Sequence, residues 1–167
     1  MERWIFKAHR LRKMITRAIC LTLGVFSLSA NADYVGKVVR VIDGDTVAVL
    51  TSGEMKRVRL NGIDAPESKQ AFGLKSKQML IKLVAQKYVL VATDEADRYG
   101  RDLGTLILKG QDINAQQVIS GMAWAYRYKG VAVNPHYVAL EQTAAKSGVG
   151  LWSESNPITP WSWRKSH

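Results

Sequence analysis

Residues 34–63 read YVGKVVRVIDGDTVAVLTSGEMKRVRLNGI, and this stretch determines the fold. Residues 34–42 are rich in valine and run into Asp43-Gly44-Asp45, so they predict a strand followed by a turn. Residues 46–50 predict a second strand and residues 56–63 a third. The first part of the chain is therefore expected to form a run of short strands.

The third predicted strand alternates in polarity with a period of two. Its two faces are Lys56, Val58 and Leu60 on one side, and Arg57, Arg59 and Asn61 on the other. Asp64-Ala65-Pro66 should end the run, because proline disfavours helical backbone in the residue before it.

The rest of the chain predicts three helices and two more strands. Residues 74–84 carry apolar side chains at helical spacing with lysines opposite, which is typical of an amphipathic helix. Residues 88–93 and 103–108 predict strands, and residues 113–120 and 136–147 predict helices that end at glycine. This order fits an α+β fold: a five-stranded OB-type β-barrel with three helices. A plain α+β sheet is the alternative.

The N-terminus has the pattern of an export signal. A basic stretch ending at Arg17 leads into the apolar run 18–28, and Ala30-Asn31-Ala32 follows as a small-x-small cleavage site. The apolar run is shorter than the roughly 20 residues that span a bilayer, so cleavage after Ala32 is favoured over an uncleaved membrane anchor. We expect a signal peptide over 1–32, a domain over 33–152 and a tail over 153–167. The mature protein is expected to be secreted or periplasmic, without stable membrane association, and monomeric.

The charge of the whole chain overstates that of the mature domain. The net charge is +10, but residues 1–32 carry six basic residues and one acidic residue, which leaves +5 for the remainder. This moderate basicity indicates a polyanionic partner such as nucleic acid. The single cysteine, Cys20, lies in the predicted signal, so the mature chain has no disulfide.

Four carboxylates lie at strand ends or turns of the first half of the chain: Asp43, Asp45, Asp64 and Glu67. Acids gathered where phosphate must bind indicate a divalent cation, which reverses the local sign of the field. Oxygen ligands without cysteine favour calcium or magnesium over zinc. Arg59 and Arg101 can each hold two phosphate oxygens with a planar fork. Taken singly these motifs are typical of turns, loops and solvated strand positions, so the argument depends on their joint occurrence.

In this order the motifs resemble the staphylococcal nuclease family. The matching segments are Val41–Thr46, Arg59–Glu67, Asp97–Arg101 and Gly150-Leu151-Trp152, and the similarity extends from about Tyr34 to Trp152. The resemblance implies an OB-fold and calcium-dependent hydrolysis of DNA and RNA that leaves 3′-phosphate ends.

The resemblance also assigns roles to individual residues. Asp45 and Asp64 match calcium-binding carboxylates, and Ala65 stands where the family often has a threonine that offers its backbone carbonyl to calcium. Arg59 and Arg101 match the phosphate-binding arginines, and Glu67 the general base. Asp43 matches a carboxylate close behind the metal ligands, and Tyr99, Tyr126 and Tyr128 match tyrosines that line the nucleotide pocket.

Two other functions are compatible with parts of this pattern. A nucleic-acid-binding OB-fold module without catalysis would need the basic charge, but such modules lose the carboxylates and arginines that this chain keeps. A calcium-dependent structural or adhesion protein would explain the acids but gives no reason for Arg59 and Arg101. The tail, with Trp161 and Trp163, is expected to pack on the barrel rather than to bind a partner.

Overall fold

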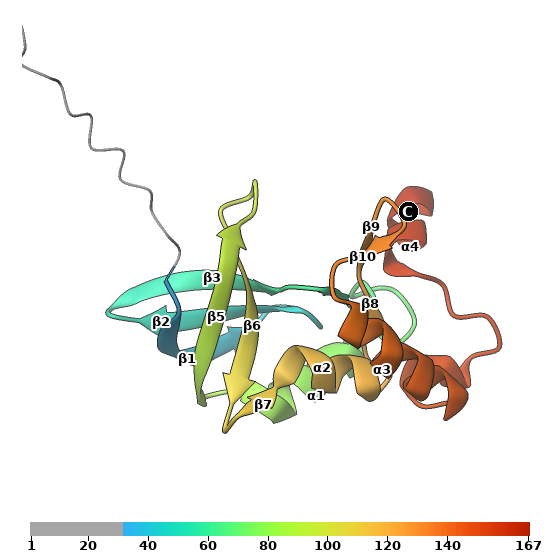
Figure 1. The fold of residues 1–167 in the computed structure, drawn as a ribbon, viewed down its shortest axis with the longest axis horizontal. Helices are drawn as coiled ribbons and strands as arrows, with labels where there is room; N and C mark the ends of the chain where they lie inside the picture. The colour runs from blue at the N-terminus through green and yellow to red at the C-terminus, as the bar shows by residue number, and fades with distance from the viewer. Residues whose placement is uncertain (1–31) are drawn as a thin grey trace, which may run out of the picture. The chain divides into compact units, whose positions relative to one another are not determined.

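The computed structural model describes residues 32–167, which form one compact unit. Five strands make the barrel, and they are β1 (Tyr34–Val41), β2 (Thr46–Thr51), β3 (Glu54–Leu60), β5 (Tyr88–Ala96) and β6 (Asp102–Leu108). Their order is β3-β2-β1-β5-β6, and a parallel pairing between β3 and β6 closes the barrel. This confirms the predicted α+β fold with a five-stranded OB-type barrel, which is seen side-on in Figure 1.

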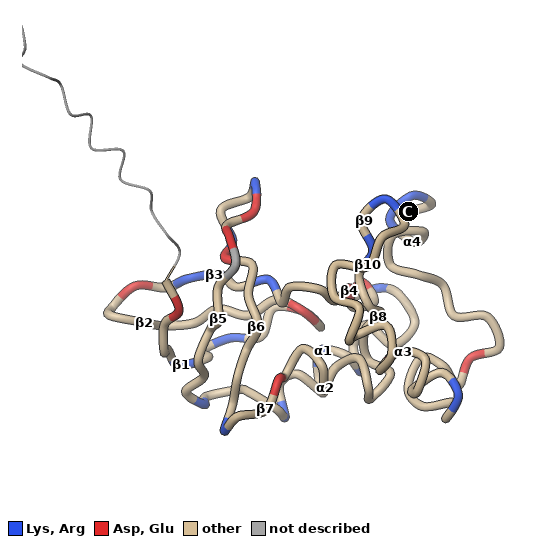
Figure 2. The backbone as a smooth tube through the Cα atoms, in the orientation of Figure 1, with Lys and Arg blue, Asp and Glu red and all other residues tan. Residues whose placement is uncertain are grey.

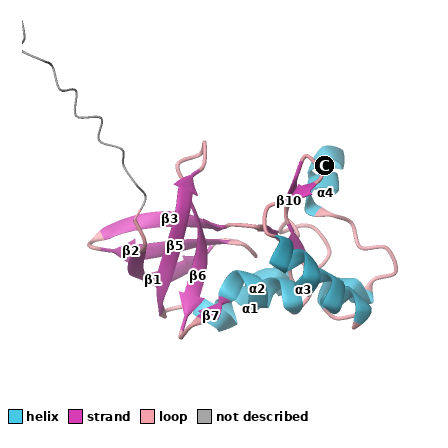
Figure 3. Ribbon diagram, in the orientation of Figure 1, coloured by secondary structure: helices cyan, strands magenta, loops and turns pink. Residues whose placement is uncertain are grey.

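The helices gather at one end of the barrel, as Figure 3 shows. They are α1 (Gly73–Val84), α2 (Ile113–Ile119), α3 (Pro135–Lys146), the 3₁₀ helix η1 (Gly150–Ser153) and α4 (Pro160–Ser166). The described residues thus contain four α-helices rather than the predicted three. The fourth is short and begins at Pro160 after the cap residue Thr159, within the predicted tail 153–167, for which no helix was predicted.

Short strand pairs complete the fold beyond the barrel. They are β4 (Ile63–Asp64) with β8 (Trp124–Ala125), β9 (Arg127–Tyr128) with β10 (Val131–Ala132), and β7 (Gln111–Asp112) on the edge of β6. In the β4–β8 pair, Asp64 lies opposite Trp124.

Two predicted strand ends each differ from the structure by three residues. The third strand ends at Leu60 rather than Ile63, because Gly62 has a φ of +75° and turns the chain before β4 begins. Strand β5 continues to Ala96, three residues beyond its predicted end. Residues 95 and 96 continue the pairing with β6 in a ribbon that projects from the barrel in Figure 1, where Glu95 and Ala96 are exposed and the strand needs no apolar face.

The core fills the barrel and the space beneath the helices. Val58 and Leu60 of β3 are fully buried, as the alternation in the sequence predicted. Leu80 and Val84 of α1 and Ile113 of α2 pack against the same cluster. None of the helices in the described part is long and apolar enough to cross a membrane.

Candidate active site

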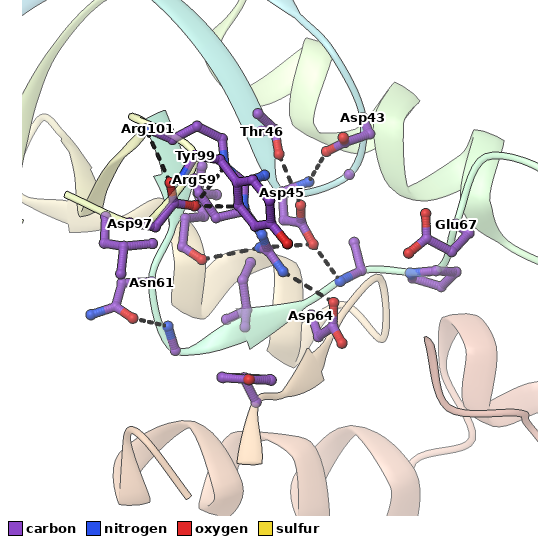
Figure 4. A pocket seen from close by; sticks show the side chains of 18 of the residues that line it. Asp43, Asp45, Thr46, Arg59, Asn61, Asp64, Glu67, Asp97, Tyr99 and Arg101 are labelled. Atoms are coloured by element: carbon purple, nitrogen blue, oxygen red, sulfur yellow. Dashed lines mark hydrogen bonds and ion pairs between the residues drawn. The ribbon is translucent and has the colours of Figure 1, made fainter. Parts of the chain in front are cut away.

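A cleft of about 510 Å³ in the barrel wall brings most of the predicted site residues together (Figure 4). The predicted residues that line it are Asp43, Asp45, Arg59, Asp64, Ala65, Glu67, Tyr99, Arg101 and Tyr126. Tyr128 is not among the lining residues. It lies on β9, is 61% exposed, and has the Lys129 ammonium 5.4 Å from the centre of its ring.

The turn between β1 and β2 is fixed by tight packing around Gly44. A Cβ atom at this position would lie 2.1 Å from Ser76 Oγ and 2.6 Å from Ala65 Cβ, so a larger residue would displace α1 or the segment after β4. The buried Gln117 side chain donates a hydrogen bond of 2.7 Å from Nε2 to the Gly44 carbonyl. Asp43 Oδ1 accepts a hydrogen bond of 3.1 Å from the Asp45 N–H. These contacts set the position of Asp45.

Asp45 and Asp64 converge on the guanidinium of Arg59. Arg59 Nη1 lies 2.8 Å from Asp45 Oδ2, and Nη2 lies 3.0 Å from Asp64 Oδ1. Both carboxylates are buried, at 6% and 1% exposed, and Asp45 Oδ2 also accepts a 2.6 Å hydrogen bond from Ala65 N–H. Two acids from different elements therefore point at one positive charge.

Burial raises the pKa of Asp45 to about 7. The attraction of Arg59 and the hydrogen bond from Ala65 lower it, while the negative charges of Asp43 and Asp64 raise it further. Because Asp45 sits 2.8 Å from a guanidinium and its pKa is still raised, the loss of hydration outweighs the attraction of that single positive charge. Ionised acids at this site therefore lose hydration free energy that Arg59 does not fully restore, and a cation bound beside Arg59 would offset that loss.

The oxygen donors of this site fit a hard divalent cation. Within residues 32–167 no cluster of three or more His, Cys, Asp or Glu side chains can hold a metal. Asp45 and Asp64 are the two carboxylates that meet at Arg59, and if they held a cation, further positions would be filled by the Ala65 carbonyl and water. Such a mixed set of carboxylate, carbonyl and water oxygens is what calcium accepts. In the structure, the guanidinium of Arg59 lies between Asp45 and Asp64 and supplies the positive charge at these acids.

Arg101 reaches the cleft from the loop between β5 and β6. Its guanidinium is bound to Asp97, with Nη2 and Nε at 2.7 and 2.8 Å from Oδ2. Asp97 Oδ1 accepts hydrogen bonds from the backbone N–H groups of Tyr99 and Arg101. Burial alone would raise the pKa of Asp97, but these hydrogen bonds outweigh it and lower the pKa below its ordinary value. Tyr99, 67% exposed, lies beside the Arg101 guanidinium.

Glu67 is held by a residue that the sequence did not single out. Arg164 of α4 lies with Nη1 2.7 Å from Glu67 Oε1 and Nη2 2.8 Å from Asp64 Oδ2. Hydrogen bonds that its guanidinium donates to these acids, first to Asp64 and then to Glu67, raise the pKa of Arg164. The guanidinium is therefore charged at any physiological pH.

Two contributors to the site were missed by the sequence, for different reasons. Asp97 stands four residues before Arg101 in a turn-forming segment, and an aspartate that accepts backbone N–H groups two residues on is a recognisable turn signal. Arg164 has no such signal, because its contacts with Asp64 and Glu67 cross about a hundred positions of sequence. Only the packing of α4 brings it to the cleft.

This chain is similar to a known protein family and to several known proteins. Residues 57–154 match the family model described as staphylococcal nuclease homologue. The chain is 44% identical to Protein ParB of Escherichia coli over 94% of each chain. It is also 44% identical to the micrococcal nuclease of Shigella flexneri, over 85% of this chain and 87% of the relative. An uncharacterized endonuclease of Haemophilus influenzae is 42% identical over 92% of this chain and 86% of its own length.

Proposed function

This chain belongs to the staphylococcal nuclease family, and on that basis we propose that it is an exported, calcium-dependent nuclease that hydrolyses DNA and RNA and leaves 3′-phosphate ends. One observation carries the proposal. Asp45 and Asp64 converge on a single positive charge in a cleft that also contains Arg59 and Arg101. Acids that hold a cation beside arginines that hold an anion suit the hydrolysis of a phosphodiester.

Different residues of the site have different proposed roles in hydrolysis. Calcium held by Asp45, Asp64 and the Ala65 carbonyl would supply Lewis-acid stabilisation of the phosphate charge. Arg59 and Arg101 bind the non-bridging phosphate oxygens and gain strength as negative charge builds in the transition state.

Glu67 completes the proposed reaction as the general base. It takes a proton from the attacking water, a step worth about 10²–10⁴ in rate. Asp43 acts behind the site, because its side chain accepts the backbone N–H of Asp45 and holds the turn.

The tyrosines are proposed to contact the nucleotide. Tyr99 and Tyr126 line the cleft, and an aromatic ring beside a phosphate site offers a face on which a base can stack. Tyr128 lies on the neighbouring hairpin with Lys129 and would contact the strand further from the scissile phosphate. Basic residues are also seen on β9 and α4 in Figure 2.

Cleavage of plasmid DNA and of a short RNA tests the activity. We expect cleavage with calcium, none with excess chelator, and none with zinc in place of calcium. Product ends should resist extension by a polymerase until a phosphatase removes the 3′-phosphate. Binding without cleavage in calcium would instead identify a nucleic-acid-binding module, and binding of neither polymer would leave a structural calcium protein.

The proposed export and assembly state have separate tests. Mass spectrometry of the exported protein should find Asp33 as its first residue, and a mature form that retains Arg3 to Arg17 would contradict the proposed signal. Sedimentation of the mature protein should give the mass of a monomer.

A further inference from the structure

Helix α4 places a further arginine, Arg164, in the cleft, beyond the residues 57–154 that match the family. Arg164 contacts two acids with proposed roles in the reaction. Its Nη2 lies 2.8 Å from Asp64 Oδ2, and its Nη1 lies 2.7 Å from Glu67 Oε1 and 3.2 Å from Asp64 Oδ1. One planar guanidinium thus links the two acids.

The backbone under Arg164 is anchored by contacts that also reach Glu67. The buried Gln70 side chain accepts a 3.1 Å hydrogen bond from the Glu67 N–H at Oε1. The same side chain donates a 2.6 Å hydrogen bond from Nε2 to the Ile158 carbonyl, just before α4. The acid and the helix are therefore tied to one amide.

A second anchor joins α4 to the strand that carries Asp64. The ring of Trp161 on α4 lies 5.8 Å from that of Trp124, edge to face. Trp124 pairs directly with Asp64 across the β4–β8 ladder. Because both ends of the Arg164 contact are fixed by packing, the arrangement is built into the fold rather than made by a long side chain alone.

Arg164 and Arg59 both contact the Asp64 carboxylate, and of the two only Arg164 contacts its Oδ2. Arg59 lies 3.0 Å from Oδ1, which Arg164 also approaches at 3.2 Å. The shorter contact of Arg164 is with Oδ2. If a cation held by Asp45 and Asp64 displaced Arg59, the contacts of Arg164 with Asp64 Oδ2 and with Glu67 would remain available. The contacts of Arg164 with Asp64 and Glu67 are therefore compatible with a bound cation.

We propose that Arg164 is a positioning residue for hydrolysis: it fixes Glu67 relative to Asp64, so that the base meets a water beside the bound phosphate. The inference rests on the proposed function. Glu67 is in an irregular segment after β4 with its side chain 41% exposed, so without a partner it would sample several rotamers. Since Arg164 occupies Oε1, Oε2 is the oxygen that takes the proton.

Arg164→Gln tests the proposal, with Lys165→Gln as the matched control. Lys165 is the next residue of the same exposed helix, so its replacement makes the same change in charge. We expect Arg164→Gln to lower kcat by about 10- to 100-fold with KM little changed, because misplacing a catalytic group mainly costs rate. Lys165→Gln should keep kcat. Arg164→Lys should fall between, because an ammonium lacks the fork that reaches both acids.

Two further measurements separate positioning from a structural role. Added guanidinium ion at non-denaturing concentration should restore part of the kcat of Arg164→Ala and none of that of Glu67→Gln. In metal-free buffer, the effects of Arg164→Gln and Glu67→Gln on unfolding free energy should be non-additive, because the two side chains are in contact.

The outcomes distinguish this inference from the proposed function. If the unaltered protein does not cleave nucleic acid, the proposed function fails. If it cleaves and Arg164→Gln keeps its kcat, the positioning role is wrong. If Arg164→Gln binds calcium more tightly in calorimetry and also cleaves faster, the proposal is overturned too, because Arg164 would then compete with the metal. Additive unfolding free energies would show that the contact is not formed in solution.

Discussion

Arg59 and Arg101 line the same cleft but are held in different ways. Arg59 extends from a barrel strand and bridges two buried acids that belong to other elements. Arg101 stands in a projecting loop and is bound to Asp97, four residues before it in the same loop. The barrel half of the site is therefore set by the fold, whereas the loop half is set by local turn chemistry. In both halves the arginine must leave an acid to reach a phosphate: Arg59 leaves Asp45 and Asp64, and Arg101 leaves Asp97.

The largest expected effect comes from replacing each arginine by lysine. Arg59→Lys and Arg101→Lys should each lose about 10²–10³ in kcat, because lysine keeps the charge but cannot hold two oxygens of a developing transition state. The measurement is kcat and KM on a short single-stranded substrate at two salt concentrations. Arg57→Lys, on the exposed part of the same strand, is the control.

The opposite result would have a clear meaning. If both variants keep kcat and bind the substrate more weakly, with a defect that shrinks at low salt, the arginines only attract phosphate. If Arg59→Lys alone loses kcat, the transition state is stabilised from the barrel half.

The next effect concerns the acid in the barrel half. Because the pKa of folded Asp45 is about 7 and its ordinary value is 3.8, the folded protein retains a proton that the unfolded chain releases. Stability is therefore highest below pH 4 with respect to this group and is lost as pH rises toward 7. Between pH 5 and 7 the free energy of unfolding of the metal-free protein should fall by about 2–3 kcal/mol through Asp45.

Denaturant unfolding at several pH values, in chelator, measures this slope. Asp45→Asn should remove it, and the same substitution at exposed Asp33 should leave it in place. Calcium should also flatten the curve by favouring the ionised acid. An equal slope in Asp45→Asn would place the titrating group elsewhere.

The smallest effect concerns the loop half. Asp97→Asn keeps the oxygen that accepts the Tyr99 and Arg101 backbone N–H groups but removes the ion pair with the Arg101 guanidinium. A surface pair of this kind, here partly buried, is worth about 1 kcal/mol, so releasing Arg101 should lower KM by about fivefold at constant kcat. Steady-state kinetics will decide, with Glu95→Gln, at an exposed position of the same ribbon, as control. A fall in kcat would mean that Asp97 orients Arg101 rather than competing for it.

The sequence predicts the features that depend on local residue patterns and misses those that depend on long-range packing. The barrel strands and the grouping of Asp45, Arg59 and Asp64 were predictable, because valine-rich alternation and turn signals are local properties of the chain. Helix α4 was missed because seven residues, PWSWRKS, give no clear helical period. The role of Arg164 depends on the Trp161–Trp124 contact and on Gln70, which link residues far apart in sequence. Long-range side-chain packing leaves no periodic trace.

The parallel pairing of β3 with β6, which closes the barrel, also sets when the protein can act. It places Arg59 opposite Leu103, so the two arginines share a cleft only after segments distant in the chain have met. Pairings of this kind form late and slowly in folding. An unfolded or partly folded chain therefore carries both arginines without an assembled site. Regain of the proposed cleavage during refolding would therefore report barrel closure. Under the proposed export, a chain that crosses a membrane unfolded would do so without cleaving nucleic acid in the compartment where it was made.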